Sequence, residues 1–472
     1  MVRRILSDSP QNGSARKQLI LMTDRREQPC VVEHLTRRSV LAGAGSVGLA
    51  GCLGSGDSPD ATTHDGSNQT ETTEDGAGTD TDDTANTEHT PTDDEEDSTW
   101  EVEGSPLEAS FDVTVAVENL EIPWDIEFAP GGDVFITERP GRIRRLDIDA
   151  LTSDTPIDES ELPEEPVTLP DLSARGEGGI LGITLHPAYP DPSFVYVFYT
   201  AEDDQKVDRV VRYDAADVDE VETIVDDLPG ARYHNGGRIA FGPDEQLWIS
   251  RGDVVDPDAS QDPSSLVGAV LRVTADGKPA GSDEAPADAD PRVFTYGHRN
   301  VQGIDWLPDG TPITTEHGPT ARDEVNLLSP GHNYGWPVAR GGPDDPEYEA
   351  YDGDGPFSPP VASSGTDETW APSGGTWYDD EAIPQLENRF LFGGLRSQRV
   401  HVITLLDPGS QPPPDASGVY SAAWFDDRYL AVRHELLVEE FGRIRHVSSG
   451  PDGRLYFLTS NGDDVIGRLD PV

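Results

Sequence analysis

Residues 239–250 read IAFGPDEQLWIS: an apolar strand, a Gly-Pro-Asp turn, then a second strand rich in aromatic and β-branched side chains. Similar units recur along the chain, at residues 126–137 (IEFAPGGDVFIT), 183–197 (ITLHP to FVYV), 304–310 (IDWLPDG) and 447–459 (VSSGPDGRLYFLT), with a degenerate copy at 375–380 (GTWYDD). Repeated strand–turn–strand units are typical of closed β architectures.

The spacing of these units indicates one closed ring. Their turn prolines, Pro130, Pro187, Pro243 and Pro308, lie roughly 60 residues apart, longer than a blade of about 40–50 residues, and loops on one face would account for the excess. Six units predict an all-β, six-bladed β-propeller over residues 105–472, in which radial repetition hides most strand edges. The alternative is a two-sheet sandwich whose turns resemble one another by chance.

The composition is strongly acidic. The chain has 472 residues, with 90 Asp and Glu against 34 Lys and Arg, and a formal net charge of −56. This charge excludes a generic nucleic-acid-binding protein, which needs a basic surface. Acidity with scarce lysine keeps a protein hydrated in molar salt, so we expect an extreme halophile as the source. The cysteines are Cys30 and Cys52, which excludes a disulfide or a thiol ligand in the predicted propeller.

The N-terminal region is predicted to be a targeting segment. Residues 36–41 read TRRSVL, a twin-arginine pattern, and a short, weakly apolar stretch follows and ends in LAGC at Cys52, which resembles a lipobox. We therefore expect export by the twin-arginine route and lipid anchoring through Cys52 at the outer face of the cell membrane. A chance arginine pair before a buried helix is the alternative. Residues 1–52 form this signal, and the Asp/Glu/Thr-rich residues 53–104 are predicted to be a disordered linker.

Two polar clusters precede predicted strands. Residues 233–238 read YHNGGR, and His234 is a candidate general base because histidine side chains change charge near neutral pH. A loop histidine bonded to the backbone is the alternative. Residues 296–303 read YGHRNVQG, where Arg299, Asn300 and Gln302 could together bind a planar anion, unless Arg299 pairs with a local acid.

Two further clusters suggest a cation and an anion. The EHGP segment at 316–319 and the RDEVNL segment at 322–327 combine carboxylates with turn carbonyls, which are typical oxygen ligands of Ca²⁺, although a solvated acidic loop would look the same. Arg443 and Arg445 alternate along one predicted strand and therefore share a face. They indicate an anionic partner, or else pairing with local acids.

Six segments occur in an order that resembles a known family. They are residues 178–187 (GGILGITLHP), 234–238 (HNGGR), 297–303 (GHRNVQG), 316–319 (EHGP), 323–327 (DEVNL) and 333–337 (NYGWP). Together they resemble the soluble aldose (glucose) dehydrogenases that depend on pyrroloquinoline quinone (PQQ), over the chain from about residue 120 to the C-terminus. The resemblance implies a six-bladed propeller that oxidises an aldose at C1 to the lactone and passes a hydride to PQQ and then electrons to an external acceptor.

The resemblance also implies site residues. His234 would be the base and Arg299 would polarise the quinone. The residues implied to bind PQQ are Glu177, Arg299, Asn300, Gln302, Ser373, Arg396, Arg443 and Arg445. The Gly318 and Pro319 carbonyls would hold a Ca²⁺ beside PQQ, and Glu324 with the Tyr334 carbonyl a second Ca²⁺.

Two residues depart from the family pattern. Glu177 stands where glutamine is common, and a carboxylate facing PQQ would repel it unless it is protonated or paired, for instance with Arg175. Arg396 stands where some members have lysine, which keeps the charge but changes the geometry. Two alternatives stay open: a non-catalytic binding propeller of the cell surface, which Glu177 favours, and a Ca²⁺-dependent lactonase or other hydrolase on the same propeller.

Overall fold

A computed structural model describes residues 100–202, 204–340, 348–349, 351 and 356–472. These residues form six β-sheets and very little helix, namely α1 (Ile148–Leu151) and the 3-10 turns η1 (Pro106–Glu108), η2 (Glu159–Glu161) and η3 (Pro257–Gln261). The all-β prediction is confirmed. The predicted signal, Cys52 and the linker up to residue 99 lie outside the described residues.

Each sheet is one blade, built largely from consecutive strands. The first three blades are β2 (Pro123–Phe128), β3 (Asp133–Glu138) and β4 (Arg142–Asp147); β6 (Ile180–Leu185), β7 (Phe194–Glu202), β8 (Lys206–Asp214) and β9 (Asp217–Pro229); and β10 (Ile239–Phe241), β11 (Leu247–Ser250), β12 (Ala269–Val273) and β13 (Val293–Tyr296).

In two of the other three blades, the outer strands do not follow the order of the chain. They are β14 (Val301–Trp306), β15 (Pro312–Glu316), β16 (Glu324–Leu327) and β17 (Ala362–Ser363); β18 (Pro372–Tyr378), β19 (Arg389–Gly394), β20 (Arg399–Leu406), β22 (Leu430–Leu436) and β21 (Gly418–Tyr420); and β23 (Ile444–Ser449), β24 (Leu455–Thr459), β25 (Asp464–Pro471), β1 (Phe111–Leu120) and β5 (Ile157–Asp158).

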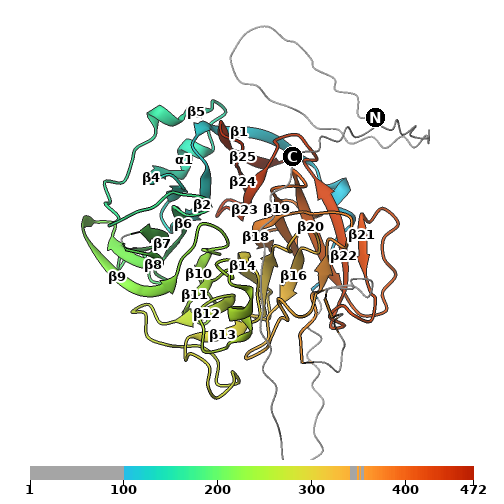
Figure 1. Cartoon of the computed structure of the whole chain (residues 1–472). Coiled ribbons are helices and arrows are strands. Elements are labelled where there is room, and N and C mark those ends of the chain that lie inside the picture. The colour runs from blue at the N-terminus through green and yellow to red at the C-terminus, as the bar shows by residue number, and fades with distance from the viewer. Residues whose placement is uncertain (1–99, 203, 341–347, 350, 352–355) are drawn as a thin grey trace, which may run out of the picture. The chain divides into compact units, whose positions relative to one another are not determined.

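The first strands of the blades form a closed ring around the axis (Figure 1). Strand β2 contacts β6, and the contacts continue in order through β10, β14, β18 and β23, which returns to β2. Each sequence unit that recurs around a turn supplies the first strand of a different blade. The six-bladed propeller is therefore confirmed.

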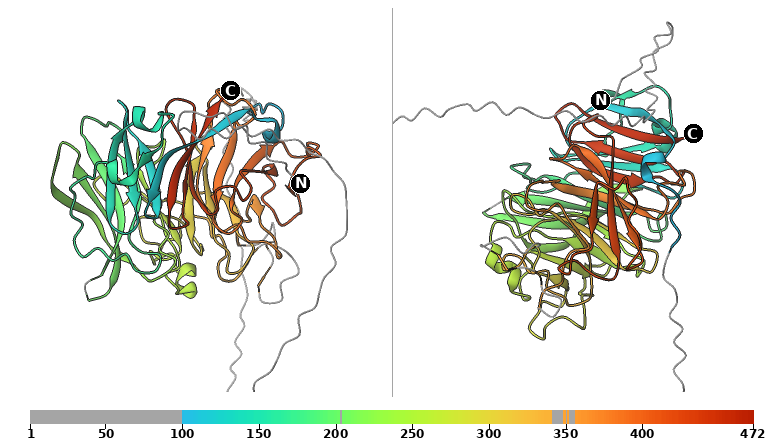
Figure 2. Two further views of the ribbon diagram at one scale, coloured as in Figure 1. Left: turned by 90° about the horizontal axis from the view of Figure 1, so that it is seen from above. Right: turned by 90° about the vertical axis from the view of Figure 1, so that its right-hand side faces the viewer.

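The ring closes by pairing the two ends of the propeller. Strand β1 runs antiparallel to β25, with Val113 opposite Leu469 and Phe111 opposite Pro471. Figure 2 shows these strands side by side, β1 in blue and β25 in red. Both strands would otherwise present an unpaired edge, so the pairing locks the first described strand to the last one.

The described part of the chain begins slightly before the predicted domain boundary. Trp100 packs edge-on against Trp377, with ring centroids 4.8 Å apart, and the Gly104 carbonyl accepts a hydrogen bond from Arg389 at 2.9 Å. Residues 100–104, assigned to the linker from composition, thus contact the fifth blade. No helix in the described part of the chain is long and apolar enough to cross a membrane.

Candidate active site

Five of the six axial strands carry a β-bulge at the same end of the ring. The register shifts fall in β2, β6, β14, β18 and β23. A bulge turns one side chain away from the regular alternation of a strand. The side chains at these bulges include Trp124, Leu181, Gln302, Ser373 and Arg445, and all except Ser373 line a cavity on the axis.

This axial cavity, of about 240 Å³, is strongly cationic. Four arginines line it: Arg139, Arg396, Arg443 and Arg445. The other polar lining residues are Glu177, Asn235, Gln302 and His317. Burial lowers the pKa of Arg445 to about 9, and repulsion from Arg139 and Arg443 adds to the shift. A cavity that holds several arginines together at this cost is suited to an anion.

Two neutral oxygens hold Arg445 in the lining of the axial cavity. Its Nη1 atom donates to Gln302 Oε1 at 3.2 Å and to Ser373 Oγ at 3.3 Å. Its Nε atom is buried and has no hydrogen-bond partner in the described structure, and the same holds for Asn300 Nδ2 and His317 Nε2. Buried donors without partners are costly, so these atoms fit a site completed by a polar ligand.

His234 and Asp253 form a dyad beside this cavity. His234 Nδ1 lies 2.7 Å from Oδ1 of the buried Asp253, whose Oδ2 accepts a hydrogen bond from Trp336 Nε1 at 3.0 Å. Because a carboxylate accepts only, we assign the proton to Nδ1, which leaves a lone pair on Nε2. Arg299 Nη2 lies 3.2 Å from that Nε2 atom.

Arg299 is fixed by the loop that follows β15. Its backbone N–H donates to the Glu316 carboxylate, and its Nη1 donates to the His317 carbonyl at 3.1 Å. The guanidinium carbon lies 5.4 Å from the Trp336 ring centroid, within cation–π distance. Burial lowers the pKa of Arg299, and the negative charges of Asp253 and Glu316 oppose this shift.

Asn300 joins the His234 loop to the fourth blade. Its Oδ1 atom accepts the Gly236 backbone N–H at 3.1 Å, while Gly252 sits between the two loops. A Cβ atom at Gly252 would collide with the His234 carbonyl and approach Asn300, so only glycine permits this close packing. Asn300 thus supports the His234 loop.

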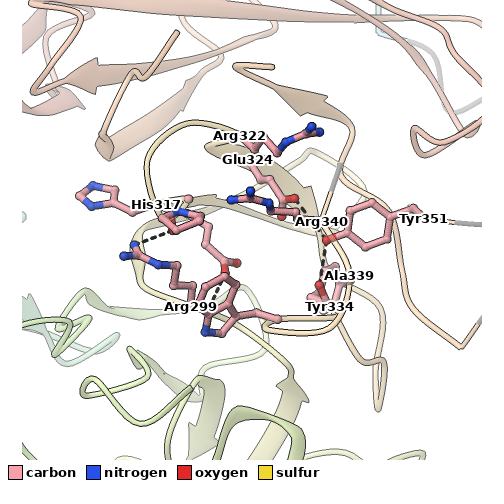
Figure 3. Close-up of a pocket in the computed structure, with 12 residues that line it drawn as sticks. Arg299, His317, Arg322, Glu324, Tyr334, Ala339, Arg340 and Tyr351 are labelled. Carbon is pink, nitrogen blue, oxygen red and sulfur yellow. Dashed lines mark hydrogen bonds between the residues drawn. The ribbon is translucent and has the colours of Figure 1, made fainter. Parts of the chain in front are cut away.

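A second cavity, the Glu324 cavity, contains the predicted calcium ligands (Figure 3). Gly318, Pro319, Glu324 and Tyr334 line it, and His317 lines both cavities, so the two adjoin. The Tyr351 hydroxyl lies 3.2 Å from Glu324 Oε1 and 2.9 Å from the Tyr334 carbonyl. The two oxygens expected to hold a second Ca²⁺ therefore share a hydroxyl group. Arg322 and Arg340 line the same cavity, as Figure 3 shows.

The structure therefore brings the predicted residues together in two adjoining groups. Glu177, Gln302, Arg396, Arg443 and Arg445 line the axial cavity. Ser373 bonds to Arg445 and Asn300 supports the loop of His234, whose imidazole contacts Arg299. The four predicted metal ligands line the Glu324 cavity.

Sequence reasoning missed Asp253, Arg139 and Trp336. Asp253 follows β11 and Arg139 follows β3, at the edge of the blade where the axial strand begins. In an antiparallel pair, the end of the second strand lies beside the start of the first strand. The position of both residues after the second strand of a unit is therefore the signal that could have identified them. Arg175 is exposed and lies 4.0 Å from Glu202, so the structure does not support its suggested pairing with Glu177.

Comparison with known proteins identifies the family of this chain. The family model described as glucose/sorbosone dehydrogenase matches residues 120–468. The chain belongs to the glucose/sorbosone dehydrogenase family. It is an oxidoreductase of the family that includes the soluble PQQ-dependent aldose dehydrogenases, and the resemblance seen in the sequence is confirmed.

Individual members of the glucose/sorbosone dehydrogenase family are similar over most of the propeller. The aldose sugar dehydrogenase of Escherichia coli K12 is 27% identical over 77% of this chain and 94% of its own length. The solved PQQ-bound aldose sugar dehydrogenase of Streptomyces coelicolor is 34% identical, with a TM-score of 0.59, over 78% of this chain and 99% of that one. The quinoprotein glucose dehydrogenase B of Acinetobacter calcoaceticus is 28% identical over 51% of this chain and 55% of its own length.

Proposed function

We propose that the protein oxidises an aldose at C1 to the lactone, with PQQ in the axial cavity and one Ca²⁺ beside it. The observation that carries this proposal is the cavity lined by four arginines, with the His234–Asp253 dyad beside it. PQQ has three carboxylates, which arginine forks bind well. The PQQ-bound relative from Streptomyces coelicolor, with its similar propeller, adds support.

The residues present fit such a cofactor. Arg443 and Arg445 lie on the last axial strand and its approach, Arg139 and Arg396 follow the second strands of their blades, and all four line one cavity. The unpartnered donors of Arg445 and Asn300 would be satisfied by carboxylate or quinone oxygens. When bound, PQQ supplies a two-electron acceptor that takes the hydride from the sugar C1 carbon.

His234 is proposed to take the proton of the sugar C1 hydroxyl at its Nε2 atom. Its Nδ1 proton stays on the bond to Asp253, whose negative charge stabilises the imidazolium that forms. Arg299 lies next to the same Nε2 atom, and its positive charge would stabilise the electron density gained by a bound quinone, which is the role that the family resemblance implies. Loss of the hydroxyl proton and of the C1 hydride leaves the ring oxidised by two electrons, which is the lactone.

One calcium ion is proposed at the Gly318 and Pro319 carbonyls. Main-chain carbonyls are suitable ligands for this hard cation, and they adjoin the axial cavity through His317. No group of three acidic, histidine or cysteine side chains in the described chain could hold a metal by itself. We do not propose a second ion at Glu324 and Tyr334, because the Tyr351 hydroxyl already bonds both oxygens and two arginines line that cavity.

We also propose export and lipid anchoring at Cys52, supported by the residue pattern alone. The external electron acceptor would then meet the enzyme outside the cell. A Cys52→Ala variant should appear in the medium as a soluble protein, and retention in the membrane fraction would contradict the anchor.

Substitution of His234 tests the proposed chemistry. His234→Ala should abolish turnover while PQQ stays bound, because the four arginines of the cavity remain in place. Retained PQQ absorbance after gel filtration and the rate of dye reduction are measured on the same sample. A variant that keeps most of its activity would show that another group takes the proton.

A further inference from the structure

The Glu177 side chain contacts the loop that carries His234, the proposed base, whereas Arg175 of its own segment lies near Glu202. Glu177 lies in the turn before β6, where its backbone N–H donates to the Arg232 carbonyl at 2.8 Å. Its side-chain Oε2 atom accepts the backbone N–H of His234 at 2.9 Å. A Cβ atom on Gly176 would collide with the Arg232 carbonyl, so the turn rests directly on the 232–234 segment.

His234 needs this support because its backbone is strained. Its φ angle is +60°, in the left-handed region that residues with a side chain rarely adopt. Such conformations persist only where the surroundings fix them. Asp253 fixes the imidazole through Nδ1, and Glu177 fixes the main chain of the same residue through its N–H.

Glu177 is also the only acidic side chain among the described residues that line the axial cavity, where four arginines meet it. Arg139 lies beside the Glu177 turn, since its carbonyl accepts the Ile180 backbone N–H at 3.0 Å. Burial lowers the pKa of Arg139, Arg443 and Arg445, and the charge of Glu177 opposes that shift in all three. One carboxylate thus offsets one of four positive charges.

We propose that Glu177 is a positioning residue for His234 and the internal counter-charge of the arginine cluster, and that Arg139 is an anion-binding arginine of this cavity. The first role rests on the proposed function of His234, whereas the second depends only on the cavity. With Glu177 ionised, the lining carries three net positive charges, which matches a ligand with three carboxylates. The departure at residue 177 is then compatible with cofactor binding, because Arg139 compensates for it.

Two substitutions separate the roles of Glu177. Glu177→Gln removes the charge but keeps a side-chain carbonyl that can accept the His234 N–H, whereas Glu177→Met, of similar size, removes both. Both substitutions remove the negative charge among the four arginines, so both variants should bind an anion more tightly. For the same reason both should have a lower melting temperature than the wild type when free of cofactor. Only Glu177→Met should lower kcat strongly, by about tenfold or more relative to Glu177→Gln, because only it releases the His234 backbone.

Anion binding is measured with PQQ and with benzene-1,3,5-tricarboxylate, a redox-inactive trianion, at one fixed KCl concentration. We expect the Kd for both to fall about tenfold in Glu177→Gln, the order of effect of one charge at cavity distances. Arg139→Gln should raise the Kd by a similar factor, and the double variant should return close to the wild type. Arg175→Gln is the matched control, since Arg175 is exposed and near Glu202, and should change neither Kd.

The outcomes distinguish this inference from the proposed function. An unchanged or higher Kd for the trianion in Glu177→Gln, or a double variant that behaves like Glu177→Gln alone, would overturn the counter-charge and the role of Arg139. Equal kcat values for the Gln and Met variants at saturating PQQ would overturn the positioning role. Trianion affinities that shift as expected in a protein without turnover would refute the proposed function and leave the counter-charge standing.

Discussion

Replacing Asp253 by asparagine should slow the enzyme without emptying its cofactor site. The Asp253 carboxylate is buried and accepts from three donors, His234 Nδ1 at 2.7 Å, the Val255 backbone N–H at 2.8 Å and Trp336 Nε1 at 3.0 Å. An asparagine must turn its amide donor toward one of these groups. In either orientation the negative charge opposite the proposed imidazolium is lost.

The size of the loss follows from the charge pair. Two unit charges about 4 Å apart attract by about 4 kcal/mol at an effective dielectric constant near 20. The His234 side chain is 21% exposed, so water screens part of this attraction. We therefore expect kcat to fall by about 10²- to 10³-fold, or roughly 3–4 kcal/mol at 1.36 kcal/mol per factor of ten.

Steady-state dye reduction at saturating PQQ and CaCl₂ measures kcat, and PQQ absorbance after gel filtration measures binding. Asp258→Asn is the control, because Asp258 is exposed in η3, close to Asp253 in sequence. It should have the wild-type rate. A kcat for Asp253→Asn within threefold of the wild type would refute the role of the dyad, as would a loss of rate that is fully explained by lost PQQ.

Three further predictions concern the cofactor, stability and the metal. Arg445→Leu should raise the Kd for PQQ by about 10- to 100-fold in equilibrium dialysis, because buried charge-assisted hydrogen bonds are removed, and an unchanged Kd would refute its role. Burial lowers the pKa of His401 well below the ordinary 6.5, so on acidification the unfolded chain binds a proton at this residue before the folded chain does. As the pH falls below 6.5, this group lowers the free energy of unfolding of the wild type by up to about 1.4 kcal/mol per pH unit. The difference in free energy of unfolding between the wild type and His401→Gln should therefore narrow between pH 7 and 5, and a constant difference would contradict the shift. Metal analysis after gel filtration should find one Ca²⁺ per chain, removable by a chelator together with PQQ, and two ions per chain would contradict the proposal of a single site.

The repeat and the order of motifs were enough to predict the ring and most of the cavity. The recurring turns identified the first strand of each blade, and the alternation of Arg443 and Arg445 indicated an anion site. Asp253 was missed because it is one acid in a chain with 90 Asp and Glu, and only its place after the second strand of a unit marks it. Its role arises from long-range packing, since the ring places it against His234 and Trp336.

The role of Glu177 shows a second limit of the sequence. Its charge suggested repulsion of an anionic cofactor, and only the packing of its turn against residues 232–234 reveals the bond to the His234 backbone. Arg139 lies far from the other cavity arginines in sequence, so its contribution to the charge balance depends on ring closure. Charge within a cavity has to be summed over every blade that lines it.

Aldose oxidation through PQQ is tested most directly by reconstitution. The purified protein in molar KCl is loaded with PQQ and CaCl₂, passed through gel filtration, and mixed with glucose or other aldoses and an artificial dye acceptor, with and without a chelator. We predict dye reduction that requires both PQQ and Ca²⁺, with lactone formed in equal amount. No dye reduction with any aldose, together with loss of PQQ on the column, would contradict the proposed function.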